Sequence, residues 1–476
     1  MSISTLSRDK GHEIWLPDYQ GRSGRLYVAI ADALADDIAK GRLKPGERLP
    51  THRELAWRLK LSVSTISKAY ALAERRHLVA GEVGRGTFVI PRPTDLSSVE
   101  PNRAQSDVID LSFNCPVIFP EHRQAIALAL RTITESGRIE NLIPYHRDWL
   151  GLPEHRAAAG RWLSHLGVAA EVDDIVLVNG AQQAAAAILS ALTEPGDAIG
   201  LEELTDPGIR FLAANRHLKI RSLPIDEDGV VPGSFETACR EGSLRLAFLI
   251  PTHHSPTLAV MPEERRREIG EIAARYNVTV IENDVYGSLV DPPSTPLASF
   301  APEHCFYLTS HSKILAPGLR IGFIAAPPGR AKDLIPGLAA TTWMASLVPA
   351  EIASHLIENG SAARLAAQQR QELQRRQAMA AEILEGQQFR SLSTGFHVWL
   401  TLPEHWRAES FVAALKVRGV AVTPAEAFIV GQGSSAHAVR ISLGGATQSR
   451  TELRRGLETI AEVLREKRSA ASFLVL

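Results

Sequence analysis

The sequence predicts a multidomain α/β protein in which a small helical module with a β-hairpin precedes a larger domain of alternating strands and helices. The chain has 476 residues, more than one hydrophobic core usually serves. Its N-terminal part combines short helical patterns with a glycine turn, whereas apolar strand patterns alternate with helical patterns further on. Length and periodicity therefore indicate at least two domains of different architecture.

The composition is that of an ordinary globular protein with a basic N-terminal part. The formal net charge is −1, with 22% charged and 45% hydrophobic residues, which excludes a disordered or polyionic chain. Residues 21–90 contain 13 Lys and Arg and 7 Asp and Glu, so they carry +6 and the remainder carries −7. A basic end on a nearly neutral chain indicates an anionic partner.

The cysteines and the N-terminal stretch predict the compartment. Cys115, Cys239 and Cys305 have no paired spacing that would indicate a disulfide framework or a metal site. The first dozen residues include charges and lack the apolar core of a signal peptide, and no later apolar run is long enough to span a bilayer. We expect a cytoplasmic protein without a membrane partner.

Three helices and a hairpin are expected in order along residues 20–90. Apolar residues recur on one helical face from Leu26 to Lys40, and Gly41 ends this first helix. Thr51 to Glu54 reads as a capping box that opens a second helix through Leu59. A third helix follows Ser62, with Ile66, Ala69, Leu72 and Ala73 buried and Ser64, Thr65, Ser67 and Lys68 outward.

Two short β runs complete this module. They cover residues 78–79 and 87–90 and flank the turn Gly84-Arg85-Gly86. Helix, helix-turn-helix and hairpin together make a winged helix-turn-helix. Residues 91–107 follow with three prolines and no apolar periodicity, which predicts a linker.

The remaining residues, 108–470, are expected to form the larger domain. Strand patterns at 175–179, 244–250, 278–283 and 319–327 alternate with helical patterns such as Pro262 to Tyr276, which predicts a mostly parallel sheet. From about Glu351 the pattern is strongly helical. Strands at 396–403 and 438–445 then predict a smaller C-terminal α+β lobe.

Residues 26–89 resemble the winged helix of the GntR family. The segments LPTHRELA, LSVSTISKAY and GRGTFV match that family's helix-turn-helix and wing. The resemblance implies a double-stranded DNA operator as partner, with a recognition helix in the major groove and an arginine-tipped wing on the adjoining backbone. The candidate DNA contacts are Arg53, Ser64, Thr65, Lys68 and Arg85.

Each of these candidates has a simpler interpretation when taken singly. A surface Arg or Lys is usually only a solvated charge, and Thr65 can pack against the neighbouring helix. Val63 stands where the family often carries an arginine at the start of the recognition helix. A guanidinium contact is therefore missing, and we expect an operator preference different from the family's usual one.

Residues 108–470 resemble fold-type I aminotransferases, which depend on pyridoxal phosphate (PLP). The segment from Thr309 to Gly322, TSHSKILAPGLRIG, matches the family pattern S-x-S-K-x-x-x-P-G-x-R-x-G. The order of winged helix and then aminotransferase-like domain resembles the MocR subgroup of GntR regulators. The resemblance implies that Lys313 bonds covalently to the cofactor.

The same resemblance assigns the grip on the cofactor phosphate. Ser310, Ser312 and Arg320 supply hydroxyls and a guanidinium. Upstream, a predicted strand runs into a glycine turn and an alanine-rich helix, whose free amides can receive the phosphate. That helix start contributes Gly180, Ala181 and Gln182. A plain surface lysine and an ion-paired arginine are the alternatives for Lys313 and Arg320.

Three further residues match family positions. Arg440 matches the arginine that binds the α-carboxylate of an amino-acid substrate, with a strand-end salt bridge as the alternative. Tyr286 matches the tyrosine that contacts the cofactor 3′-oxygen. Tyr145 resembles the tyrosine that reaches the phosphate of the partner subunit's cofactor. Its spacing to the next glycine, Gly151, is one residue longer than in the family.

Three positions depart from the catalytic pattern. Asn283 stands where an aspartate pairs with the pyridine nitrogen, and a neutral amide provides no negative charge to stabilise a pyridinium. Asp206 replaces an aromatic residue that stacks on the ring, and Ser255 replaces an asparagine that holds the 3′-oxygen. Compensation by Asp284 or a neighbouring histidine, or a one-residue alignment slip at Asn283, is the alternative.

We therefore predict a homodimeric transcription regulator whose aminotransferase-like domain senses PLP or the adduct of PLP with an amino compound, without efficient transamination. Two rivals stay open. The first is an active aminotransferase with an appended DNA-binding domain, against which Asn283 argues. The second is a regulator whose large domain has lost PLP and serves dimerisation or another effector, against which Lys313 argues.

Overall fold

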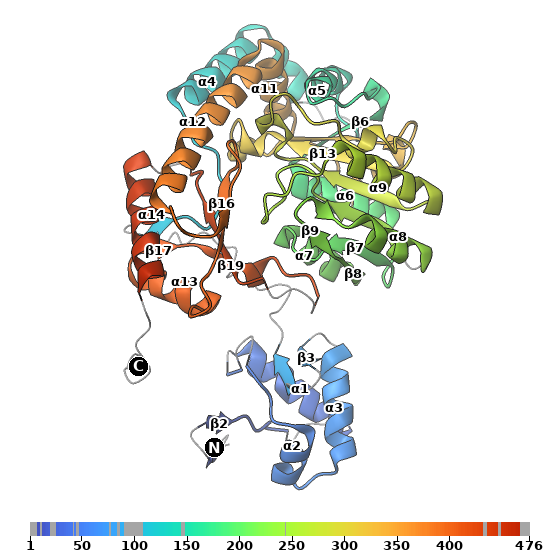
Figure 1. Cartoon of the computed structure of the whole chain (residues 1–476). Helices are drawn as coiled ribbons and strands as arrows, with labels where there is room; N and C mark the ends of the chain where they lie inside the picture. The colour runs from blue at the N-terminus through green and yellow to red at the C-terminus, as the bar shows by residue number, and fades with distance from the viewer. Residues whose placement is uncertain are drawn as a thin grey trace. The chain divides into compact units, whose positions relative to one another are not determined.

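The chain forms two compact units, Met1–Ser97 and Ser98–Leu476. The computed structural model describes residues 7–9, 12–19, 25–40, 42–43, 47–75, 78–82, 86–89, 108–143, 148–242, 244–431, 436–445 and 449–466. Figure 1 shows the helices and strands of both units, coloured from blue at the N-terminus to red at the C-terminus. The predicted linker, residues 91–107, lies outside the described residues, and the predicted domain limits stay a prediction.

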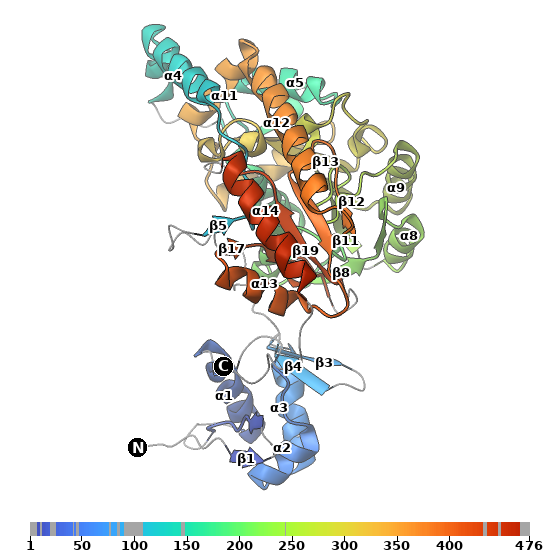
Figure 2. The same cartoon turned by 60° about the vertical axis from the view of Figure 1, so that its left-hand side comes forward.

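The smaller unit has the predicted order of helices and hairpin (Figure 2). Its elements are β1 (Ser7–Asp9), β2 (His12–Ile14), α1 (Leu26–Ala39), α2 (His52–Leu59), α3 (Val63–Arg75), β3 (Val79–Glu82) and β4 (Gly86–Val89). β3 and β4 pair antiparallel and form the wing, whereas the antiparallel pair β1 and β2 was not predicted. Trp15, just after β2, is buried, and its indole Nε1 donates to Asp37 of α1 over 2.8 Å.

Side-chain caps fix the two helices of the helix-turn-helix. The Thr51 hydroxyl accepts from the Glu54 amide over 3.2 Å at the start of α2, and the Ser62 hydroxyl accepts from the Thr65 amide over 3.1 Å at the start of α3. Such caps satisfy amides that have no partner within the helix. Lys60 ends α2 with φ +55°, which turns the chain sharply into α3.

A seven-stranded sheet forms the centre of the larger unit. Its order is β6-β14-β13-β12-β11-β7-β8. Only β14 runs antiparallel to its neighbours, so the predicted mostly parallel sheet is confirmed. The strands are β6 (Ile175–Val178), β7 (Ala198–Glu202), β8 (Lys219–Leu223), β11 (Leu244–Leu249), β12 (Thr279–Asn283), β13 (Cys305–Ser310) and β14 (Gly322–Ala325).

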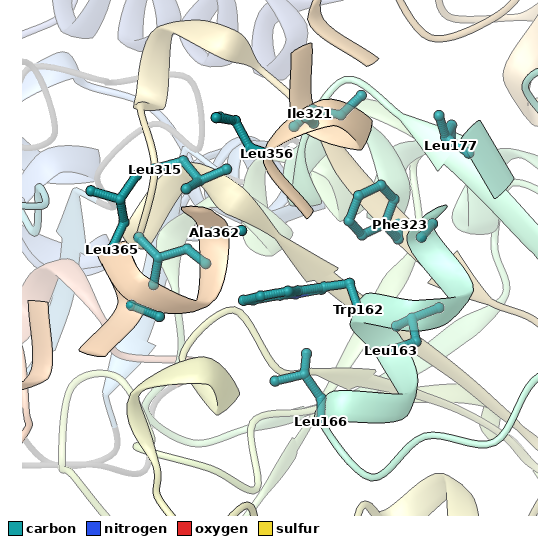
Figure 3. Close-up of a cluster of buried hydrophobic side chains, with 14 of the residues drawn as sticks. Trp162, Leu163, Leu166, Leu177, Leu315, Ile321, Phe323, Leu356, Ala362 and Leu365 are labelled. Atoms are coloured by element: carbon teal, nitrogen blue, oxygen red, sulfur yellow. The ribbon is translucent and has the colours of Figure 1, made fainter. Parts of the chain in front are cut away.

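Helices cover both faces of this sheet because its strands are apolar on both sides (Figure 1). Three helices pack on one face: α6 (Ala181–Leu192), α7 (Pro207–Asn215) and α10 (Ile335–Ala339). There Ile188 of α6 shares a buried cluster with Ile281 of β12 and Phe306 of β13. α8 (Pro232–Arg240) and α9 (Glu263–Tyr276) pack on the other with Val280. Figure 3 shows the neighbouring cluster, in which Trp162 of α5 (Pro153–His165) lies among leucines and Phe323.

A smaller lobe follows, as predicted. Its sheet has the order β15-β16-β19-β18, built from β15 (Phe389–Arg390), β16 (His397–Thr401), β18 (Thr423–Pro424) and β19 (Ala438–Ser442). The helices that pack with it are α12 (Ser361–Ile383), α13 (Ala408–Val417) and α14 (Arg450–Arg465) (Figure 2). β5 (Ile109–Asp110), the first strand of the larger unit, pairs with β17 (Val420–Ala421) and so joins this lobe.

The remaining helical elements border the site or the outer surface. They are α4 (Pro120–Glu135), η2 (Arg138–Leu142), η3 (Val172–Asp174), η4 (Gly287–Leu289), η5 (Leu297–Ser299), η6 (His311–Lys313), η7 (Pro317–Leu319), η8 (Ala331–Leu334), α11 (Leu347–Glu358) and η9 (Ala425–Ala427). Within the described ranges, no helix combines the length and the apolarity that a bilayer crossing needs.

Candidate functional site

A basic cradle forms where β6 runs into α6. Gly180 caps α6 with φ +88°, and a Cβ atom at this position would lie 2.7 Å from Nη2 of Arg320. Arg320 donates to the Ser312 hydroxyl and to the Asn179 carbonyl, both over 3.4 Å. Only glycine permits this close approach. Ala181 opens α6, so the free amides at the start of this helix lie beside the exposed guanidinium of Arg320.

Lys313 ends η6, one short turn after β13. Its Nζ donates to the Asn114 carbonyl over 2.6 Å and lies 5.5 Å from the Phe113 ring centre and 5.8 Å from that of Tyr286. Ser310, buried at the end of β13, and half-buried Ser312 come from the same turn as the lysine. The Lys313 side chain is therefore half-buried and hydrogen-bonded within the larger unit.

Asn283 and Asp284 point to opposite sides of the sheet. The Asp284 carboxylate accepts from the Tyr307 hydroxyl over 2.7 Å, and burial raises its pKa. Burial likewise raises the pKa of its neighbour Glu282 to about 7, against the opposing charge of Arg266. Because side chains alternate along a strand, Asn283 shares the other face with Ile281, beneath α6. Asp284 is thus held away from the α6 side.

Asn114, which the sequence did not single out, links several site residues. Its Nδ2 lies 3.1 Å from the Tyr286 hydroxyl and 3.0 Å from Nδ1 of His397. The other ring nitrogen of His397 lies 2.8 Å from the Pro256 carbonyl, which can only accept. His397 Nε2 therefore carries the hydrogen and Nδ1 accepts from the amide. Burial, followed by the charge of Arg440, holds the pKa of His397 well below its usual value.

Arg440 is buried in β19 at the other end of the pocket. It donates to the Ser255 hydroxyl over 3.1 Å and to the Ser112 carbonyl over 2.8 Å, and it stacks 4.6 Å from the Phe428 ring centre. Its Nε has no partner among the described residues. Burial lowers its pKa, whereas the charges of Tyr286 and Asp206 oppose that shift. None of the hydrogen-bond partners is a carboxylate, so the guanidinium is not half of a strand-end salt bridge.

Asp206 and Gln182 meet at the start of α7. The Asp206 carboxylate accepts from the Gly208 amide over 2.8 Å and caps this helix, and the Gln182 side chain donates to the Gly208 carbonyl over 3.0 Å. Asp206 therefore has a structural role where the family has a stacking aromatic ring. Ser255 likewise bonds to Arg440, so its hydroxyl is engaged with the carboxylate-binding end of the pocket.

The DNA-binding candidates lie on the smaller unit. Arg53, Ser64 and Lys68 are exposed on α2 and α3, and Val63 is 46% exposed. Thr65 is half-buried, and its hydroxyl lies 2.8 Å from that of Ser62. A capping role for Thr65 thus competes with DNA contact. The predicted residues Arg85 and Tyr145 lie outside the described residues.

Two protein families match the chain. Residues 106–460 match the family described as aminotransferase class I and II, and residues 26–89 match the bacterial regulatory proteins of the gntR family. A solved archaeal alanine:glyoxylate aminotransferase has the same fold, with a TM-score of 0.71 and 23% identity over 84% of this chain and 99% of its own. The predicted fold-type I architecture is confirmed.

Two transcription regulators match the chain over most of its length. An HTH-type transcriptional regulator of Bacillus subtilis, YdeF, is 32% identical over 94% of this chain and 96% of its own. The vitamin B6 salvage pathway transcriptional repressor PtsJ of Salmonella typhimurium is 28% identical over 90% of this chain and 96% of its own. The chain therefore belongs to the aminotransferase class I and II family and, with its gntR-family module, to the MocR type of GntR regulator.

Proposed function

We propose that this protein is a DNA-binding transcription regulator whose aminotransferase-like domain senses PLP or the adduct of PLP with an amino compound. One observation carries the proposal. Lys313 and the cradle of Gly180 and Arg320 keep the arrangement of a PLP pocket, whereas Asn283 brings a neutral amide where a catalytic pocket needs a carboxylate.

The residues present fit the cofactor. A Cβ at Gly180 would fill the cradle beside Arg320, so the position is kept open at the helix start. The side-chain oxygens of Asn283 and Asn114 and the Nε of Arg440 are buried without partners among the described residues. Buried polar atoms normally find a hydrogen-bond partner, so these three atoms indicate a polar ligand in the pocket.

Each residue then has a definite task. When bound, PLP supplies an aldehyde that reacts with amines and an aromatic ring that withdraws electrons. Lys313 offers the amine, and Arg320 with the α6 amides holds the phosphate. Arg440 binds the carboxylate of an amino compound, because its buried guanidinium bonds to a hydroxyl and a carbonyl and has no carboxylate partner among the described residues. Tyr286 hydrogen-bonds the 3′-oxygen.

The same pocket lacks the charge that transamination needs. A carboxylate beside the pyridine nitrogen would keep the ring protonated and so strengthen its ability to withdraw electrons. Asn283 provides no such charge, and Asp284 is engaged with Tyr307 on the far side of the strand. His397 is held neutral by burial and donates to Pro256. Binding without efficient turnover is therefore the function that these residues support.

The DNA end and the subunit arrangement complete the proposal. The exposed residues Arg53, Ser64 and Lys68 contact a double-stranded operator, together with Thr65 and Arg85. The chain acts as a homodimer, with Tyr145 reaching the partner's cofactor. The relative PtsJ is named a vitamin B6 salvage repressor, which supports a B6 vitamer as the sensed compound.

Absorbance spectroscopy tests the sensing half. Purified wild-type protein titrated with PLP should develop a visible band that borohydride abolishes, and Lys313→Ala should not develop it. Arg320→Ala should raise the PLP concentration at half-saturation at least about tenfold, since a charge-assisted contact is worth about 1.5–3 kcal/mol. Arg390→Ala, on the surface of the small lobe, is the matched control. No band in the wild type would refute PLP sensing.

Measurements of turnover and of DNA binding distinguish the proposed sensor from an active aminotransferase and from a regulator that does not use PLP. Rapid keto-acid-dependent consumption of an amino donor would identify an active aminotransferase. A duplex selected from a random library by the wild-type protein serves as operator. If its affinity is the same with and without PLP although the visible band forms, the large domain has another role.

A further inference from the structure

The segment of residues 110–114 joins the ligand pocket to the chain that leads to the DNA-binding unit. It begins three residues after the predicted linker, 91–107, and it belongs entirely to the larger unit. We call it the relay segment. No residue of this segment lies in a sequence motif that matched a family pattern.

The relay segment contacts the residues on which the proposed ligand acts. The Asn114 carbonyl accepts from Lys313 Nζ over 2.6 Å, and the Ser112 carbonyl accepts from Arg440 over 2.8 Å. The Asn114 side chain donates to Tyr286 over 3.1 Å. Two residues of the segment, Ser112 and Asn114, thus contact the cofactor-bonding amine, the carboxylate-binding guanidinium and the ring-contacting tyrosine.

The small lobe holds the same segment from its other side. The Thr423 hydroxyl donates to the Ser112 carbonyl over 2.7 Å, and the Ser442 hydroxyl donates to the Phe113 carbonyl over 2.9 Å. The Leu111 amide donates to Ala421 over 2.8 Å. Thr423 is paired with Arg440 between β18 and β19 and shares the Ser112 carbonyl with it, whereas Ser442 and Leu111 bond to the Phe113 and Ala421 carbonyls.

We propose that the relay segment transmits ligand binding to the linker, because ligand and segment compete for Lys313 and Arg440. This rests on the proposed function. If the Lys313 nitrogen bonded to the aldehyde carbon of the cofactor, the aldehyde oxygen would leave as water with both amine hydrogens, and Lys313 would no longer donate to the Asn114 carbonyl. A carboxylate on Arg440 draws its donors from the Ser112 carbonyl. Both carbonyls then need other partners, and the segment shifts relative to β17 and β19.

Asn114 is the positioning residue of this relay. The two hydrogens of its amide reach Tyr286 and Nδ1 of His397, which accepts because Nε2 donates to Pro256. Its side-chain oxygen is buried without a partner among the described residues. The amide orientation is therefore determined by two neighbours, and a shift of the segment must break at least one of these bonds.

The test combines Thr423→Val with Ser442→Ala, which removes two anchors and keeps the side chains of Lys313, Arg320 and Arg440. Thr237→Val in α8 is the matched control, since its hydroxyl also donates to a backbone carbonyl but far along the chain from the segment. The PLP concentration at half-saturation and the operator Kd with and without PLP are measured for all three proteins.

The relay predicts that the double variant binds PLP within about twofold of the wild type but responds to it less. If PLP changes the operator Kd about tenfold in the wild type and the control, the change should fall below about twofold in the double variant. A full response in a folded double variant overturns the relay. A wild type that binds PLP with no change in operator affinity instead overturns the proposed function.

Hydrogen exchange gives a second readout if the double variant does not fold. In the wild type, PLP should alter the exchange of the Leu111 amide, which bonds to Ala421, and leave that of the Val280 amide in the central sheet unchanged. An operator affinity that responds to PLP while the Leu111 amide exchanges at the same rate would also overturn the relay.

Discussion

Three buried histidines give the larger unit a definite response to acid. Burial lowers the pKa of His253 to about 4 and that of His311 to about 3, and it holds that of His397 well below the usual value. His311 lies edge-on between Trp162 and Phe323, and neither ring nitrogen has a partner among the described residues. The folded protein therefore favours the neutral imidazoles.

The free energy of unfolding should fall as the pH decreases below about 6.5. The unfolded chain binds a proton at His311 near that pH, whereas the folded chain binds it only near pH 3. The stabilisation by neutral His311 is complete above pH 6.5, the ordinary histidine pKa of the unfolded chain, and it is lost as the pH falls toward 3. His311→Phe should reduce the stability lost between pH 7 and pH 5 by about 2 kcal/mol, measured by urea unfolding at the two pH values.

Exposed His405 provides the control for this measurement. His405→Gln should leave the pH slope unchanged. A slope in His311→Phe equal to that of the wild type would mean that His311 is not responsible for the acid response.

At the scale of elements, the caps at Thr51 and Ser62 decide which surface α2 and α3 expose. They fix where each helix begins, and the left-handed Lys60 fixes the turn between them. As a result Ile66, Ala69 and Ala73 are buried while Lys68 is exposed. A phosphate contact from this face contributes to affinity through counterion release.

Lys68→Ala should weaken operator binding on every sequence tested and reduce the salt slope of log K by about one. Fluorescence anisotropy with a selected duplex at several salt concentrations measures both. Lys219→Ala, an exposed lysine on β8 of the larger unit, should change neither. An unaltered slope for Lys68→Ala would remove this residue from the DNA interface.

At the scale of the whole molecule, an apolar surface runs over the elements that flank the pocket. Large apolar side chains are exposed on α4, around η2 and around α11: Leu128, Leu130, Ile139, Ile143, Trp343 and Val348. Ile143 is 77% exposed, two residues before Tyr145. An exposed apolar surface of this kind is typical of a subunit interface, and the homodimer proposed above would cover it.

Ile143→Asp should shift sedimentation velocity from dimer to monomer, because a charge in the interface would be buried without a partner. Val417, 89% exposed at the end of α13, is the control, and Val417→Asp should leave the dimer intact. Both variants should keep the wild-type circular dichroism spectrum. An intact Ile143→Asp dimer would exclude this surface as the interface.

Much of the fold was predictable because its signals are local. The helix starts at Thr51 and Ser62 depend on bonds three residues long, and the strand patterns around Gly180 and Lys313 lie within single segments. Less local features were missed. The antiparallel direction of β14 and the pairing of β5 with β17 depend on partners far along the chain.

The sequence by itself determined the two domains, the helix-turn-helix, the lysine and arginine of the pocket, and the neutral Asn283. Only the tertiary structure decided that Asp284 points away and that Asn114 lies between Lys313, Tyr286 and His397, which is 283 residues away in the chain. The physical reason is that strand alternation and caps act over a few residues, whereas the pocket's hydrogen bonds join segments that only the packed sheet and lobe bring together.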